Sequence, residues 1–168
     1  SEARVVRVVP SAGSDDLDLS GLAQASPVFE AVLRSLDDPF LMMFTSGTTG
    51  AAKGLYVPLR AVPAFRGYML DCVGLQEGDQ FWNIADPGWA YGLYYAIIGP
   101  LSLGHATLLY NGPFAVAEMV RVIKGNGITN LAGSPTAFRL VIAAGAEAVS
   151  EIKGQLRAVS SAGEPLNP

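Results

Sequence analysis

The sequence contains very few of the residues that build disulfides, metal centres and nucleophilic active sites. Its 168 residues include one cysteine, Cys72, and one histidine, His105. A single cysteine cannot form a disulfide within the chain, and one histidine cannot supply a His/Cys metal cluster. We therefore expect Cys72 to be a small core residue, His105 to be structural, and the protein to be cytoplasmic with no metal ligands of its own.

Charged residues are also scarce, at 15% of the chain, and the net charge is −4. This composition excludes the clustered basic face that nucleic-acid binding needs. Hydrophobic residues reach 50%, enough for a folded core. Residues 87–117 contain no Asp, Glu, Lys or Arg, although about 20 apolar residues can span a bilayer. Because glycines and prolines interrupt this segment, we expect a buried helix and a buried strand there, and no membrane span.

Apolar runs and turn residues alternate along the chain. The pattern predicts strands over residues 4–9, 40–44, 80–85, 106–110, 129–132 and 157–160. It predicts helices over residues 28–36, 59–73, 91–98, 115–124 and 135–143, the first capped at Ser26-Pro27. Strands that alternate with helices favour an α/β fold with a largely parallel β-sheet flanked by helices. We expect the run at 40–44 to be a buried strand.

A loop rich in glycine and hydroxyl groups follows the run at 40–44. This glycine loop reads Thr45-Ser46-Gly47-Thr48-Thr49-Gly50-Ala51-Ala52-Lys53-Gly54. Its backbone N–H groups can approach a phosphate without a Cβ in the way, its hydroxyls add donors, and Lys53 adds a cation. It is neither a Walker A loop nor a Gly-x-Gly-x-x-Gly fingerprint. It predicts a polyphosphate site, with a flexible loop that binds no ligand as the alternative.

The glycine loop resembles the signature loop of the AMP-binding, adenylate-forming superfamily, which includes acyl-CoA synthetases, luciferases and nonribosomal peptide adenylation domains. That family usually has Pro before the lysine, where this chain has Ala52, but Lys53 stays in register. Three later segments resemble acetyl-CoA synthetase-like enzymes, and the resemblance covers residues 38–168. The first of these segments is Ala85-Asp86-Pro87-Gly88-Trp89, followed by Gly92 and residues 95–101. The second is residues 132–139, which contain a Pro-Thr pair, and the third is residues 160–168, which contain Gly-Glu-Pro. All three occur in the order found in the family.

The resemblance implies an ATP-dependent acyl-CoA synthetase, an AMP-forming acid–thiol ligase of fatty acid metabolism. Such enzymes use ATP and Mg²⁺ to turn a carboxylic acid into an acyl-adenylate, from which the CoA thiol displaces AMP. Their protein groups position substrates and neutralise charge. By resemblance, Lys53 and Thr48 are the expected catalytic residues. The expected nucleotide contacts are Thr45, Ser46, Gly47, Thr48, Thr49, Gly50, Lys53, Gly163, Glu164 and Pro165, and the expected acyl-pocket residues are Trp89, Tyr91 and Ala162.

Several of these residues also have a structural interpretation. Trp89 could be a core anchor, Glu164 could cap a turn, and Asp86 could be an ordinary acid at a strand end. The size of the acid stays open, because Ala162 would enlarge one wall of the pocket while Tyr91 would fill another. We favour a short- to medium-chain aliphatic or small aromatic acid.

The resemblance further implies that residues 1–168 are a partial N-terminal AMP-binding domain without the C-terminal lid domain. We expect this fragment to be inactive by itself, and the exposed edges of a truncated sheet could cause self-association. The expected partners are a small carboxylic acid, ATP and CoA. Two alternatives stay open: an adenylation domain that loads a carrier-protein thiol, and a non-catalytic nucleotide-binding module.

Overall fold

The computed structural model describes residues 6–7, 17–18, 26, 28, 30–45 and 52–165. The chain divides into two units, residues 1–34 and residues 35–168. In the first unit, β1 (Val6–Arg7) pairs in parallel with β2 (Leu17–Asp18). The strand predicted over 4–9 is therefore confirmed at Val6–Arg7, while its other residues lie outside the described ones.

The helix predicted over residues 28–36 is wrong for the residues described there. Val28 and residues 30–35 have no helical backbone. The Ser26 hydroxyl accepts a hydrogen bond from the Val28 amide at 3.1 Å, which makes a local turn. Val28 and Leu33 are 85% and 95% exposed, so the apolar stripe is not buried. Short helices depend on burial of such a stripe, and spacing alone does not provide it.

The glycine loop joins the two strands of an antiparallel hairpin. β3 (Pro39–Thr45) pairs with β4 (Lys53–Pro58), and Thr45 lies opposite Lys53. The sequence pattern predicted β3 but not β4. The prediction that the run at 40–44 is buried is wrong, because Phe44 is 63% exposed and Met42 45% exposed. Residues 46–51 lie outside the described residues, so the roles expected of Ser46, Gly47, Thr48, Thr49 and Gly50 stay predictions.

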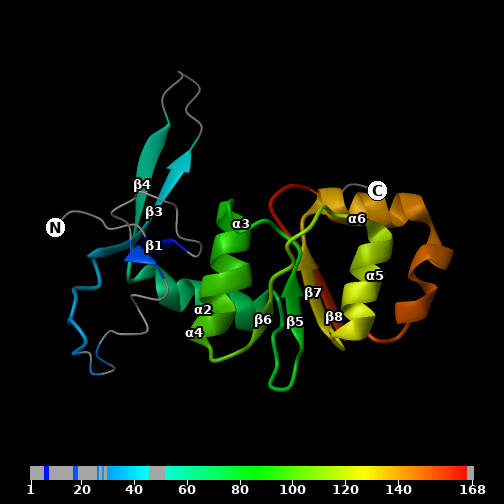
Figure 1. Cartoon of the computed structure of the whole chain (residues 1–168), viewed down its shortest axis with the longest axis horizontal. Coiled ribbons are helices and arrows are strands. Elements are labelled where there is room, and N and C mark those ends of the chain that lie inside the picture. The colour runs from blue at the N-terminus through cyan, green and yellow to red at the C-terminus, as the bar shows by residue number, and fades with distance from the viewer. Residues whose placement is uncertain are drawn as a thin grey trace. The chain divides into compact units, whose positions relative to one another are not determined.

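Four parallel strands form the central sheet of the second unit, in the order β6-β5-β7-β8 (Figure 1). They are β5 (Phe81–Asn83), β6 (Thr107–Leu108), β7 (Asn130–Gly133) and β8 (Ala158–Ser161). Every residue of β5 and β7 is buried, as expected of strands covered on both faces. Each strand overlaps its predicted range, and the predicted α/β fold with a largely parallel sheet is confirmed.

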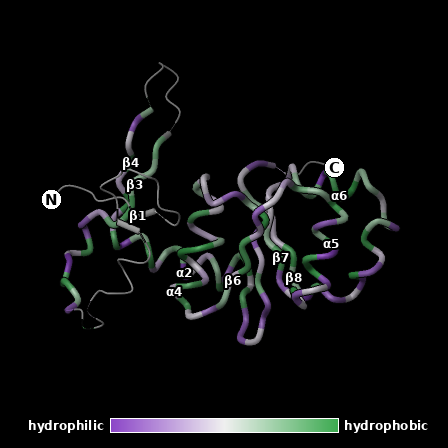
Figure 2. The backbone as a smooth tube through the Cα atoms, in the orientation of Figure 1, coloured by the Kyte–Doolittle hydropathy of each residue, from purple (hydrophilic) through white to green (hydrophobic). Residues whose placement is uncertain are grey.

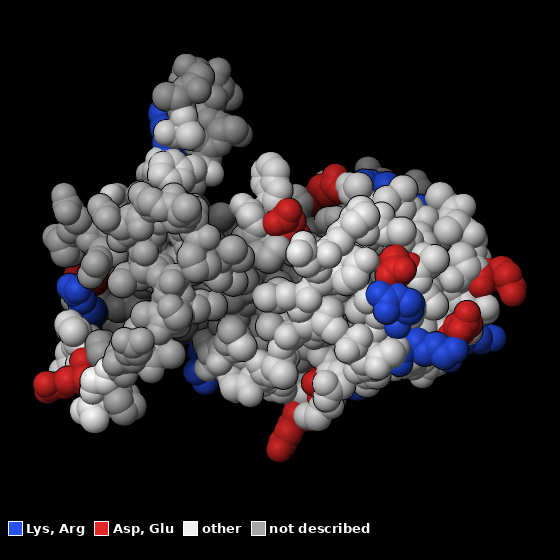
Figure 3. Space-filling view, in the orientation of Figure 1, with Lys and Arg blue, Asp and Glu red and all other residues white. Residues whose placement is uncertain are grey.

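One face of the sheet packs against α5 (Val116–Gly125), α6 (Pro135–Ala144) and the 3-10 helix η2 (Ala146–Ile152). Trp82 and Leu131 lie in this core and are each 2% exposed. Apolar and polar residues alternate along α5 at helical spacing (Figure 2). Acidic and basic residues lie on its exposed side (Figure 3), where Glu118 pairs with Arg121 and Lys124 pairs with Glu151 of η2. α5 and α6 confirm their predictions, whereas η2 was not predicted.

The opposite face packs against α2 (Ala61–Asp71) and a helical segment that follows β5. This segment consists of α3 (Ala90–Gly92), the π-helix η1 (Leu93–Ile98) and α4 (Gly99–Ser102). Phe81 points to this face, because successive residues of a strand alternate sides, and it packs with residues of α2. The helices predicted over 59–73 and 91–98 are thus confirmed, with π rather than α hydrogen bonding in η1.

Aromatic rings join the helices on this second face. Phe65 stacks on Tyr94 with ring centroids 4.5 Å apart, and Tyr68 stacks on Tyr95 at 4.1 Å. Cys72, directly after α2, is exposed, so the prediction of a core cysteine is wrong. No helix among the described residues is both long and apolar enough to cross a membrane.

Candidate functional site

The order of the strands in the central sheet indicates where a ligand would bind. The chain runs from β5 to β6 on one side, and then through α5 to β7 on the other side of β5. The sheet therefore has a switch point between β5 and β7. In open parallel sheets, ligands bind outside the carboxyl ends of the strands at such a point. The segments that follow the strands there, residues 84–91, 134–136 and 162–165, make up the candidate site.

The predicted site residues fall into two groups. Those that follow β5 and β8 are brought to the same edge of the sheet, because parallel strands end together there; they are Trp89, Tyr91, Ala162, Gly163, Glu164 and Pro165. The second group belongs to the hairpin. Lys53 is the exposed first residue of β4, opposite Thr45 at the end of β3.

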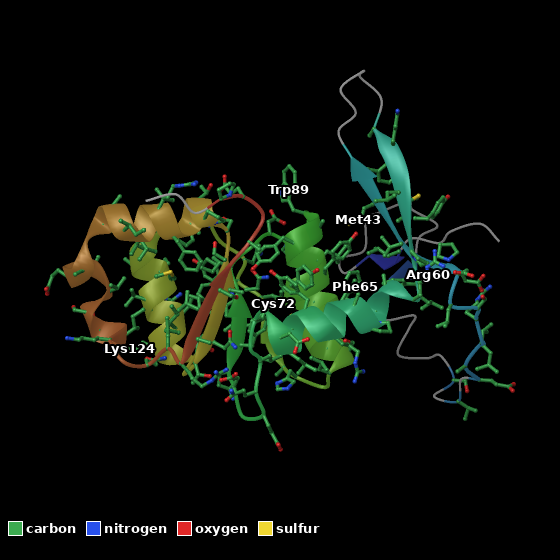
Figure 4. The ribbon with its side chains drawn as sticks, turned by 180° about the vertical axis from the view of Figure 1, so that it is seen from behind. Met43, Arg60, Phe65, Cys72, Trp89 and Lys124 are labelled. Carbon is green, nitrogen blue, oxygen red and sulfur yellow. The ribbon has the colours of Figure 1, made fainter. Side chains whose placement is uncertain are left out.

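A tight turn after β5 places Trp89 and Tyr91. The Asp86 carboxylate accepts a hydrogen bond from the Gly88 amide at 2.7 Å, and the Trp89 amide donates to the Asp86 carbonyl at 3.0 Å. A Cβ at Gly92 would lie 2.1 Å from that carbonyl oxygen, so the close approach requires glycine. Trp89 is 74% exposed and lies beyond the end of α3 in Figure 4. The interpretation of Trp89 as a core anchor is therefore wrong, whereas Asp86 acts as a turn residue.

The Tyr91 side chain is half-buried, and its hydroxyl oxygen is fully buried. Burial, together with the neighbouring Tyr68, raises the pKa of Tyr91 to about 12. The phenol therefore stays protonated near neutral pH and cannot serve as a general base. Ser160 of β8 lies close enough to oppose this rise in the pKa, but the geometry between the two hydroxyls is not that of a hydrogen bond. Sequence reasoning missed Ser160, which lies in β8 two residues before Ala162.

Glu164 caps the start of α6. Its Oε1 atom accepts hydrogen bonds from the Thr136 amide at 3.0 Å and from the Thr136 hydroxyl at 2.5 Å. The Thr136 hydroxyl, and then Arg139, hold the pKa of Glu164 below its usual range. Gly163 has φ +106°, a conformation that favours glycine, and turns the chain between β8 and this contact. The described contacts of Glu164 are thus those of a structural residue that caps another segment of the chain.

The described groups at this edge suit positioning better than proton transfer. Tyr91 is held protonated, and the Asp86 and Glu164 carboxylates already accept backbone hydrogen bonds. A cavity of about 400 Å³ opens beside the ends of β5 and β6, and an apolar one of about 650 Å³ lies among α6, η2 and β8. None of the six predicted residues at the sheet edge lines either cavity. We place the site at the switch point, because topology and sequence both point there.

Comparison with known proteins identifies the family of the chain. The sequence matches the AMP-binding enzyme family over residues 2–168. It is 36% identical over 157 residues to an acetyl-coenzyme A synthetase of Photobacterium profundum, a match that covers 87% of this chain and 23% of that protein. The Escherichia coli K12 acetyl-coenzyme A synthetase is 35% identical over 156 residues, covering 86% of this chain and 23% of that protein. The chain thus spans about a quarter of the length of these relatives.

Solved structures show the same fold. A crystal structure of a Brucella canis acyl-CoA synthetase superimposes with a TM-score of 0.87 and 55% identity, over 97% of this chain and 30% of that one. An anthranilate-CoA ligase in complex with anthranoyl-AMP superimposes with a TM-score of 0.81, over 96% of this chain and 31% of that one. At 22% identity, this second likeness concerns the fold alone. From the family match and these relatives, we conclude that the chain belongs to the AMP-binding enzyme family.

Proposed function

We propose that the protein containing this chain is an ATP-dependent, AMP-forming acyl-CoA synthetase. It activates a short- to medium-chain aliphatic or small aromatic acid as the acyl-adenylate and transfers the acyl group to CoA. Family membership supports this proposal. The observation that carries it furthest is the convergence of Trp89, Tyr91 and residues 162–165 at one edge of the sheet, beside the switch point.

The reaction suits a site that positions substrates. A substrate carboxylate oxygen attacks the α-phosphorus and pyrophosphate leaves; the CoA thiol then attacks the acyl carbonyl and AMP leaves. Because the substrate supplies its own nucleophile, the first step needs no protein base, which fits a protonated Tyr91 and an engaged Glu164. In this proposal Lys53 and Thr48 neutralise and orient the phosphates, Tyr91 and Ala162 shape the acyl end, and Gly163 borders the adenine.

Mg²⁺ would accompany the nucleotide in this proposal. The described residues include no group of three or more His, Cys, Asp or Glu side chains placed to hold a metal ion. Mg²⁺ often binds through one or two carboxylates together with substrate phosphates rather than in an all-protein cage. In this proposal, the phosphates of ATP hold most of the cation's coordination sphere. When bound, Mg²⁺ neutralises phosphate charge, and Lys53 would add to that effect from the glycine loop.

Acid-dependent exchange of radioactive pyrophosphate into ATP tests the proposal. The assay uses the intact protein with a panel of aliphatic acids of increasing length and with benzoate. We expect exchange that requires one class of acid, and at least a tenfold loss in Lys53→Ala. Lys124→Ala is the matched control, because Lys124 is exposed on α5 in an ion pair with Glu151. ATP binding without exchange for any acid would favour a non-catalytic nucleotide-binding module.

A further inference from the structure

Helix α6 begins at the carboxyl edge of the sheet, within the candidate site. The first N–H groups of a helix carry partial positive charge and commonly bind ligand phosphates. In this helix the chain itself provides their partners. Ser134 is the N-cap and accepts from the Ala137 amide at 3.4 Å, Pro135 has no N–H, and the Thr136 amide donates to Glu164.

Glu164 reaches this helix from the loop after β8, 28 residues further along the chain. A carboxylate at a helix N-terminus is favoured both by the helix dipole and by charge-assisted hydrogen bonds. The Thr136 hydroxyl and backbone amide both donate to the same Oε1 atom, so a single residue holds one carboxylate oxygen. The contact therefore joins two segments of the site that are distant in sequence.

Arg139 makes a second tie between the same two segments. Its Nη2 donates to the Pro165 carbonyl oxygen at 2.6 Å, and its Nη1 lies 3.4 Å from Glu164 Oε1. Both residues that follow Gly163 are thus attached to the first turns of α6. Neither Glu164 nor Arg139 is buried, with side chains 42% and 43% exposed. Their hydrogen bonds therefore hold the loop after β8 at the protein surface.

We infer that Glu164 is a positioning residue, whose side chain binds the start of α6 rather than the nucleotide. It fixes the backbone of residues 162–165 and occupies the helix end that a phosphate would otherwise bind. This inference rests on the proposed function, in which that backbone borders the adenine. The expected contact of Glu164 with the nucleotide is then left to its backbone, and the phosphates are left to the glycine loop.

A double-mutant cycle in the intact protein tests the inference, with pyrophosphate exchange as the assay. Glu164→Ala should raise KM for ATP about tenfold, and Thr136→Val about threefold, while KM for the acid changes less than twofold. The double variant should be no worse than Glu164→Ala, because Thr136 acts only through Glu164. Thr136→Ser keeps the hydroxyl and should restore KM to within twofold of the original. Glu151→Gln, which breaks an exposed ion pair elsewhere, is the control.

Direct action of Glu164 on the nucleotide would give another pattern. In that case Thr136→Val would leave KM for ATP unchanged, or the two effects would multiply in the double variant, and either result overturns the inference. A measurement that needs no ligand can test the role of Glu164 even if the proposed acyl-CoA synthetase function is wrong. Amide hydrogen exchange at Thr136 should speed up in Glu164→Ala even if the original protein shows no pyrophosphate exchange. Unchanged protection at Thr136 would overturn the inference by itself.

Discussion

A buried carboxylate at the edge of the sheet opposite the candidate site should determine much of the stability of the fold. Asp79 lies in the turn before β5, and its side chain is 5% exposed. It accepts hydrogen bonds from the Thr129 hydroxyl at 2.8 Å, from Arg157 Nε at 3.0 Å and from the Gln76 amide at 2.9 Å. The contact therefore joins the starts of β5, β7 and β8.

Asp79→Ala removes the common acceptor of this network. Hydrogen bonds to a charged group contribute about 1.5–3 kcal/mol each and are not additive, so we expect a loss of about 3 kcal/mol in the free energy of unfolding. For a domain of this size, that loss corresponds to a drop in Tm of about 6–12 °C. Asp71→Ala is the matched control: Asp71 is exposed at the end of α2, and its loss should change the free energy by less than about 0.5 kcal/mol.

The effect of Asp79 should depend on pH. Burial alone would raise the pKa of Asp79, but the hydrogen bonds from Arg157, the Gln76 amide and Thr129 outweigh it and hold the pKa well below the usual range. A lowered folded-state pKa stabilises the protein above the unfolded value of about 4, and the stabilisation is lost as the pH falls. The difference in the free energy of unfolding between the original protein and Asp79→Ala, measured by urea unfolding, should therefore shrink from pH 7 to pH 3. A difference in the free energy of unfolding below about 1 kcal/mol at pH 7, or a difference that is independent of pH, would refute this reasoning.

Three further predictions concern the candidate site. Gly92→Ala should destabilise the protein by about 1–3 kcal/mol in a urea titration, because its Cβ would meet the Asp86 carbonyl. Gly67 in α2 has room for a Cβ, so Gly67→Ala should be neutral or stabilising in the same titration. Gly163→Ala should raise KM for ATP more than KM for the acid, because φ +106° is strained for alanine; equal changes in both constants would contradict a role in placing the loop. Residues 1–168 alone should show no acid-dependent pyrophosphate exchange, and measurable exchange would show that no further segment is required.

The sequence predicted the central sheet well because short segments rich in apolar residues, bounded by turn residues, mark its strands. The run at 80–85 gave β5 and the run at 129–132 gave most of β7. Burial on both faces favours apolar side chains in such strands, although β5 and β7 also bury Asn83 and Asn130. This apolar signal is local. The same reasoning failed for the helix at 28–36, where the described apolar side chains are largely exposed. At 40–44 it predicted the strand correctly but not the exposure of Met42 and Phe44. A local pattern cannot tell which surface will cover it.

The candidate site divides in a similar way. Trp89 and residues 162–165 were found through motifs, and their common edge follows from parallel strands that end together. The partner of Glu164 could not be found from sequence, because Thr136 lies 28 residues away and the contact depends on how α6 begins. The bond between Asp79 and Arg157 spans 78 residues and is equally invisible to local patterns. Side-chain contacts between segments that are distant in sequence can be identified only once the fold is known.

Product analysis of a single incubation tests the central claim most directly. The intact protein is incubated with ATP, Mg²⁺, CoA and the acid that gives the fastest pyrophosphate exchange, and the products are measured by mass spectrometry. We predict that acyl-CoA, AMP and pyrophosphate form in equal amounts, and that acyl-adenylate accumulates when CoA is omitted. Formation of ADP and phosphate, or no acyl-CoA with any acid in the panel, would contradict an AMP-forming acyl-CoA synthetase.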